Sequence, residues 1–129
     1  MMTLAGIREW LSTLEVAENY YVGRLNNKKE RSLGVYNRRR SGDPVRAIGN
    51  DSTYDIKSVS LLLHWNRNAA QTEEAASALW DALMNAHNIT IEDHPVHYLR
   101  LMVPEPVAVG TDEGGIYEYV IEFDLYYRR

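Results

Sequence analysis

The sequence predicts an α+β fold, with a mostly antiparallel sheet of about five or six strands and two helices packed on one face. Two stretches, 3–14 and one that begins after residue 67, repeat apolar side chains every three or four residues, as amphipathic helices do. Other stretches alternate apolar and polar side chains, the pattern of strands with one buried face. The chain has 129 residues, so these elements fit one domain, 1–129.

The N-terminal part predicts a helix and two strands. Thr3 is the candidate N-terminal cap of the helix 3–14. The apolar stripe of this helix consists of Leu4, Ile7, Leu11 and Leu14. Two short stretches of strand composition follow, 20–25 and 32–37, and the turn-like sequence 26–30 separates them. Two short strands joined by a turn predict a β-hairpin.

The stretch 56–91 predicts a strand, a helix and a second strand, and the rest of the sheet is expected to form around this unit. Its first strand has one dominant buried face, formed by Val59, Leu61, Leu63 and Trp65. The opposite face carries Ser58, Ser60, Leu62 and His64. Because successive side chains of a strand point to opposite faces, the apolar set needs a covering layer on one side. The helix that follows is the nearest candidate.

This central helix has two alternative N-terminal caps. Thr72 is one, and it would place Glu73 and Glu74 near the positive end of the helix dipole. Asn68 is the other, with Gln71 at the third position of a capping box. The apolar stripe predicted to lie on the sheet consists of Ala76, Leu79, Trp80, Leu83 and Met84.

Residues 38–54 are predicted to form a long irregular loop. The segment is rich in Arg, Ser, Gly, Asp and Asn, and it contains few apolar residues. Loops of this length are uncommon inside compact domains and tend to be functional or disordered.

Two further strands are expected towards the C-terminus, after the short strand that closes the central unit. A short strand 90–93 is followed by Pro95, which is expected to interrupt it, and then by a strand 96–103. The glycine-rich segment 110–115 predicts a flexible turn. The final strand, 117–127, alternates most strictly, with Tyr, Ile, Phe and Leu on one face and mainly charged side chains on the other. Such alternation requires a sheet with one face that is either wet or covered by a partner.

Composition limits the available chemistry. The chain has no cysteine, so it can form neither disulfides nor thiolate metal sites. The N-terminal pattern includes Arg8 and Glu9, and is therefore expected to be neither a signal peptide nor a membrane span, which needs roughly 20 apolar residues. We expect a soluble, non-secreted domain without a membrane partner.

Charge is distributed unevenly along the chain. The formal net charge is −4, yet residues 24–46 contain eight Lys and Arg against two acidic residues, a local charge of +6. The remainder therefore carries −10. Such a chain can bind a polyanion, or it can bind copies of itself head to tail. The sequence leaves both interpretations open.

No catalytic, cofactor-binding or metal-binding residues are predicted. His94 and His97 lie near Glu92 and Asp93, but a spacing of three in an extended chain points the two rings to opposite faces unless Pro95 turns the chain. The eighteen carboxylates show no spacing that identifies a catalytic pair, and no nucleophile-elbow or phosphate-loop motif is present. The sequence therefore predicts that the protein is not an enzyme.

The sharpest polar signal is the run Arg38, Arg39 and Arg40, which Arg46 follows in the same loop. One interpretation is a solvated basic turn, because runs of charge are commonly solvated. The others are contact with the phosphate backbone of a nucleic acid and pairing with acids on a neighbouring subunit. These four arginines are the predicted interaction residues.

Several segments, in order along most of the chain, resemble a family of phage and prophage minor capsid proteins that is similar to the tail terminators of long-tailed phages. The segments are 21–25 (YVGRL), 32–36 (SLGVY), 62–65 (LLHW), 73–76 (EEAA), 79–83 (LWDAL) and 119–127 (YVIEFDLYY). They match as patterns of strands and a helix, without a functional motif.

The resemblance implies a structural subunit without a cofactor, which assembles into a hexameric ring, caps the tail tube and joins the tail to the head. Its expected partners are other copies of itself, tail-tube and neck or connector proteins, and DNA that passes through the ring and is contacted without sequence preference. The expected location is the virion, after assembly in the bacterial cytoplasm. The alternative is a monomeric nucleic-acid-binding or adaptor domain that uses the basic loop 38–46.

Overall fold

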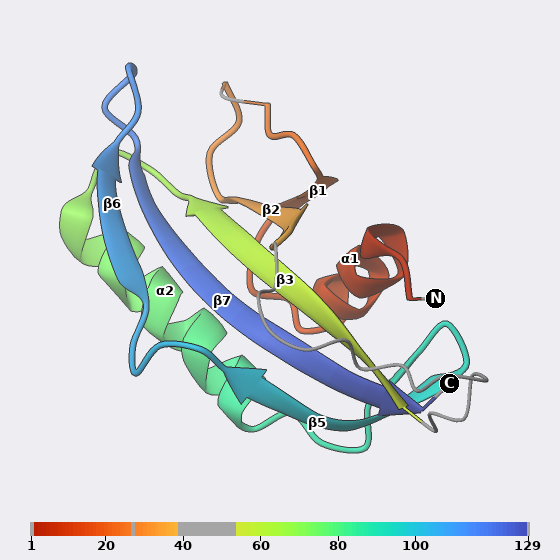
Figure 1. Ribbon diagram of the computed structural model, residues 1–129. Coiled ribbons are helices and arrows are strands. Elements are labelled where there is room, and N and C mark those ends of the chain that lie inside the picture. The colour runs from red at the N-terminus through yellow and green to blue at the C-terminus, as the bar shows by residue number, and fades with distance from the viewer. Residues whose placement is uncertain (1, 27, 39–53, 129) are drawn as a thin grey trace.

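A computed structural model describes residues 2–26, 28–38 and 54–128. The fold is α+β, as predicted, and its sheet has seven strands in the order β1-β2-β3-β7-β5-β4, with β6 also paired to β7 (Figure 1). The elements are α1 (Leu4–Ser12), β1 (Asn19–Val22), β2 (Ser32–Asn37), β3 (Tyr54–His64), α2 (Ala69–Met84), β4 (Thr90–Ile91), β5 (His94–Leu101), β6 (Val107–Thr111) and β7 (Tyr117–Arg128).

The long strands β3 and β7 form the centre of the sheet. They are antiparallel along their whole length, from the pair Tyr54 and Arg128 to the pair His64 and Glu118. The predicted alternation is confirmed in both strands, since Leu61 and Leu63 of β3 and Phe123 of β7 are buried on the same face. Because β-strands twist, such long strands curve, and Figure 1 shows the bend of β7.

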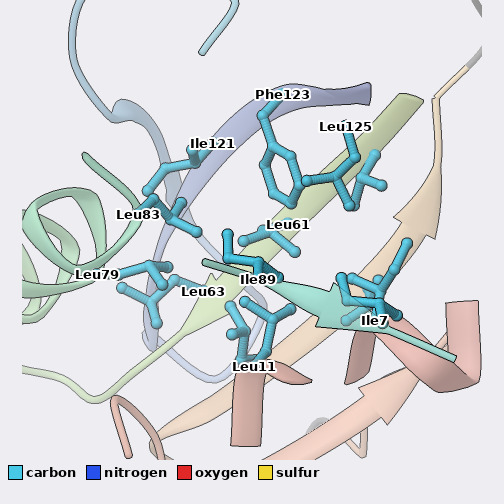
Figure 2. Packing of buried hydrophobic residues seen from close by; sticks show 14 of the residues in the cluster. Ile7, Leu11, Leu61, Leu63, Leu79, Leu83, Ile89, Ile121, Phe123 and Leu125 are labelled. Carbon is cyan, nitrogen blue, oxygen red and sulfur yellow. The ribbon is translucent and has the colours of Figure 1, made fainter. Parts of the chain in front are cut away.

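Both helices cover one face of this sheet. Figure 2 shows Ile7 and Leu11 of α1, Leu79 and Leu83 of α2 and the apolar side chains of β3 and β7 pointing into one core. The predicted cap of α1 is confirmed, because the Thr3 hydroxyl accepts the Gly6 N–H. The apolar face of β7 is thus covered by the helices of its own chain.

Asn68, one of the two candidate caps, begins α2. Its side chain accepts the Gln71 N–H at 3.0 Å. Thr72 instead lies inside the first turn, fully buried, where its hydroxyl donates to the Asn68 carbonyl. The predicted stripe is confirmed for Leu79 and Leu83. It is wrong for Met84, which is 62% exposed because the helix ends there, beyond the surface that it covers.

Asn68→Ala is expected to lower the free energy of unfolding by about 0.5–2 kcal/mol, because it leaves the first N–H groups of α2 without their side-chain acceptor. Urea denaturation followed by circular dichroism measures the loss. Asn68→Asp is the matched control, since its carboxylate can accept the same bond and also suits the helix dipole. Equal losses in the two variants would show that the cap contributes nothing.

The predicted hairpin of the first two strands is wrong, because β1 and β2 are parallel, with Tyr20 opposite Leu33 and Val22 opposite Val35. The chain leaves β1 at Gly23, whose φ of +70° suits glycine. Leu25 then packs against Gly34, where a Cβ atom would lie only 3.1 Å from the Leu25 side chain. Because β1 and β2 are parallel, the chain between them returns to the start of β2 before it enters that strand in the same direction as β1.

The C-terminal strands also differ from the prediction. Pro95 does not interrupt a strand: it lies within β5, opposite Thr90 of the edge strand β4, where a missing N–H is tolerated. Glu92 and Asp93, both with positive φ, form a two-residue turn between β4 and β5. The predicted glycine turn 110–115 begins too early, because Gly110 and Thr111 still belong to β6, a strand that was not predicted and that pairs with β7.

Glu92 links this turn to the start of α1. Its carboxylate accepts the Thr3 N–H and the Thr3 hydroxyl, both at 2.7 Å. The backbone bond first, and then the hydroxyl bond, lower the pKa of Glu92 below its ordinary 4.5. A carboxyl whose folded pKa is lowered stabilises the fold above its unfolded pKa, and this contribution is lost as the pH falls through the folded pKa.

Comparing the native chain with Glu92→Gln tests this linkage. The native chain is expected to be the more stable at neutral pH, and the difference in free energy of unfolding should shrink as the pH falls below about 4.5. Urea denaturation between pH 7 and pH 3 measures it. A difference that stays constant with pH would contradict the assignment.

Candidate interaction surfaces

The sheet has a second face, opposite the helices, which we call the outer face. Its residues include Tyr54, Ile56, Ser58, Ser60, Leu62 and His64 of β3, Glu118, Val120, Glu122, Asp124 and Tyr126 of β7, and Tyr98, Arg100 and Met102 at β5. The sequence predicted a wet or partner-covered face here. Several of its polar groups are instead buried and paired within the chain.

Arg38 is the one predicted interaction residue that the structure describes, and Arg39, Arg40 and Arg46 lie outside the described residues. It follows β2, where its N–H donates to the Ser58 carbonyl and its guanidinium pairs with the Asp124 carboxylate. The Asp124 side chain is only 3% exposed, and that of Arg38 is 19% exposed. The ion pair therefore joins the end of β2 to the middle of β7.

A second polar cluster lies at the other end of β3. The fully buried His64 ring contacts the Glu118 carboxylate through Nδ1 at 3.0 Å, and its Nε2 lies 3.7 Å from Asp112. Burial first, and then the nearby Glu118, raise the pKa of Tyr36, which flanks this cluster on β2. Within the described ranges, no group of three or more His, Asp or Glu side chains is arranged to hold a metal ion.

The two histidines considered for a metal site have separate surroundings. His94 Nδ1 lies 3.1 Å from the Arg128 carbonyl oxygen, and its ring meets that of Tyr127 edge-on. His97 is exposed where the register of β5 shifts against β7.

Three tyrosines stack on the outer face near the C-terminal end of β7. The Tyr98 and Tyr126 rings are 4.3 Å apart and nearly parallel, and Tyr54 lies 6.3 Å from Tyr126 on the other side. Partial loss of hydration, and then the contact with Tyr126, raise the pKa of Tyr98. Sequence reasoning missed Tyr98. The sequence feature that could have identified it is the alternation that places Tyr98, Arg100 and Met102 on one side of a strand.

The strand β6 forms a free edge of the sheet. All five residues of β6 are exposed, including Val107 at 44% and Val109 at 50%. A groove of about 500 Å³ lies between α2 and the chain that leads into β6. Sequence reasoning missed this groove, because it arises only where β6 and α2 flank the same part of β7.

The loop 23–31 carries Lys28, Lys29 and Arg31 of the basic segment 24–46. Lys28 and Lys29 are exposed in a turn where both of their N–H groups bond to Asn26, at 3.0 Å each. Arg31 pairs with Glu18 at 3.1 Å and lies over the Trp65 ring. By contrast α2 carries Glu73, Glu74 and Asp81 and no basic residue.

Neither helix has the length and apolar character that a helix needs to cross a bilayer, in the part of the chain that the structure describes. Three hollows, one between α2 and the chain before β6, one between the end of α2 and β5, and one beside α1, are open to solvent.

No family model matches this chain, and no curated protein matches it. Among solved structures, the chain is similar to a protein chain in the virion of a native gene transfer agent particle, with a TM-score of 0.56 and 13% identity over 92% of this chain and 84% of that one. It is also similar to the gp17 protein of bacteriophage SPP1, with a TM-score of 0.43 and 11% identity over 94% and 82% of the two chains. The first likeness shows a fold shared with a virion protein over nearly the whole chain, and the weaker second one adds nothing to that conclusion.

Proposed function

We propose that this chain is a structural virion protein, a tail terminator or head-tail completion subunit that assembles into a ring, caps the tail tube and joins the tail to the head. The observation that carries the proposal is the fold, which 92% of the chain shares with a protein of a gene transfer agent virion. The pattern of segments that resembles phage minor capsid proteins supports the same role. Assembly requires complementary surfaces and no reaction centre, so the protein is not an enzyme.

The ring is a homo-oligomer, a hexamer, held by contacts between two different patches of the subunit. The exposed lysines of the loop 23–31 and the acidic α2 support such head-to-tail contacts, because opposite charges favour this register. The other partners are tail-tube and neck or connector proteins. The protein acts in the virion and assembles in the bacterial cytoplasm.

Within this ring, Arg39, Arg40 and Arg46 contact either the DNA in the channel or the neighbouring subunit. The guanidinium of Arg38 pairs with Asp124, so Arg38 anchors the start of the basic loop. Arg39→Ala/Arg40→Ala/Arg46→Ala therefore tests the function of the loop, whereas changing Arg38 would also disturb the fold.

Light scattering and negative-stain microscopy test the proposal. The purified chain, alone or after addition of tail-tube protein, is expected to form rings whose mass corresponds to six subunits. A chain that remains monomeric at high concentration and forms no ring with tail-tube protein would overturn it. If that monomer binds duplex DNA with an affinity that falls steeply with salt, and the triple arginine variant does not, the adaptor interpretation holds instead.

A further inference from the structure

The groove between α2 and β6 has the chemistry of a site for a basic, partly aliphatic segment. Small and apolar side chains such as Ala76, Val103 and Pro106 line it, together with the carboxylates of Glu73 and Glu105. No basic side chain is among its lining residues. Glu74 and Asp81 line a shallow hollow that shares Glu73 with the groove, so the surrounding surface is acidic as well. A cation in the groove would relieve the repulsion between these carboxylates.

The adjoining edge of the sheet is also suited to being covered. The strand β6 pairs with β7 on one side, and no strand in the described part of the chain pairs with its other side. Val107 and Val109 are half exposed on this edge. Unpaired backbone groups next to exposed valines are a surface that another chain can cover.

The chain itself contains a segment that fits this groove. Lys28 and Lys29 lie in the turn of the loop 23–31, and neither forms an ion pair with a described residue. A lysine can lay its aliphatic stem along apolar walls while its ammonium group meets a carboxylate at the rim. In their own chain, Lys28 and Lys29 line another hollow, together with Arg67 and Gly114. Neither lysine is among the residues that line the groove of its own chain.

We propose that the groove between α2 and β6 binds the Lys28 and Lys29 turn of a second copy of this chain. The inference rests on the proposed assembly function and names the two surfaces that meet there. Each copy offers its turn to one neighbour and its groove to another, so the contact is heterologous and repeats around a ring. The principal charge pairs join Lys28 and Lys29 of one copy to Glu73 and Glu105 of the next.

Charge reversal on each side tests the contact. Lys28→Glu/Lys29→Glu and Glu73→Lys/Glu105→Lys are each expected to lose the assembled form, because turn and groove then carry the same sign. An equimolar mixture of the two variants should regain it, since every turn meets a groove of opposite charge when the two kinds of subunit alternate around an even-numbered ring. Glu9→Lys/Glu15→Lys is the control. It replaces two glutamates by lysines, as the groove variant does, but on and just after α1, and it should assemble normally.

Cysteine cross-linking provides an independent measurement, because the native chain has no cysteine. Mixing Lys29→Cys with Glu105→Cys under oxidising conditions should give a mixed disulfide dimer in greater yield than either variant alone gives of itself. Thermal unfolding followed by circular dichroism checks that all the variants fold.

The outcomes separate the two proposals. Normal assembly of both charge-reversed variants, or absence of the mixed disulfide where the native chain assembles, would overturn this contact and leave the ring in place. If the native chain does not assemble, with or without tail-tube protein, and the two cysteine variants give no mixed disulfide, both proposals are overturned. Loss in each variant, recovery in the mixture and the mixed disulfide together support the contact.

Discussion

Phe123→Ala is expected to lower the free energy of unfolding by about 3–5 kcal/mol, the usual cost of removing a large aromatic side chain from a packed core. Phe123 is fully buried in the middle of β7, and its ring points towards the side chains that the helices contribute (Figure 2). The loss combines the apolar contact of the ring with the cavity that it leaves. Urea denaturation followed by tryptophan fluorescence measures the change.

Met84→Ala is the control, since it truncates a large apolar side chain that is exposed at the end of α2. Its effect should stay within about 0.5 kcal/mol, because the side chain is mostly solvated in the folded state. A loss comparable to that of Phe123→Ala would mean that Met84 does lie on the sheet, as the periodicity of the helix predicted. A negligible loss for Phe123→Ala would contradict the position of the core.

Asp124→Ala is expected to lower the free energy of unfolding by about 3–5 kcal/mol, the range measured when one partner of a buried ion pair is removed. The Asp124 carboxylate is almost fully buried and pairs with the Arg38 guanidinium, which is itself mostly covered. Truncation leaves that guanidinium without this carboxylate in a poorly solvated place. Chemical denaturation at neutral pH measures the loss.

A double-mutant cycle with Arg38→Ala isolates the pair itself. The two substitutions should be non-additive, with a coupling of about 0.5–3 kcal/mol, as is found for residues in direct contact. Glu15→Ala, which truncates an exposed carboxylate beyond α1, is the control and should change stability little. Strict additivity of Arg38→Ala and Asp124→Ala would contradict the role of Arg38 as the anchor of the basic loop.

Most elements of the fold could be predicted from local patterns. The stripe of Leu79 and Leu83 and the alternation along β7 each fix a buried face within a single element, so no distant residue is needed to recognise them. The same holds for the Thr3 cap, which depends on bonds within one turn. The predictions were wrong where pairing between segments decides, as for β1 and β2, which are parallel although only a short turn-like sequence separates them.

The candidate surfaces could be predicted only in part. The basic segment is visible in the sequence because charge is a property of composition. The partner of Arg38 is not visible, since Asp124 lies 86 residues further along the chain. The groove is equally hidden, because Glu73 and Glu105 line it from α2 and from the chain before β6, which meet only after folding.

The sequence by itself determined the α+β class, the two amphipathic helices, the central strands and the separation of charge, because each follows from the order of residues within one segment or from composition. Only the tertiary structure decided the direction of β1, the existence of β6, the burial of the Arg38 and Asp124 pair and the acidic groove beside a free sheet edge. These depend on contacts between segments that are far apart in the chain, and residue periodicity carries no information about such contacts.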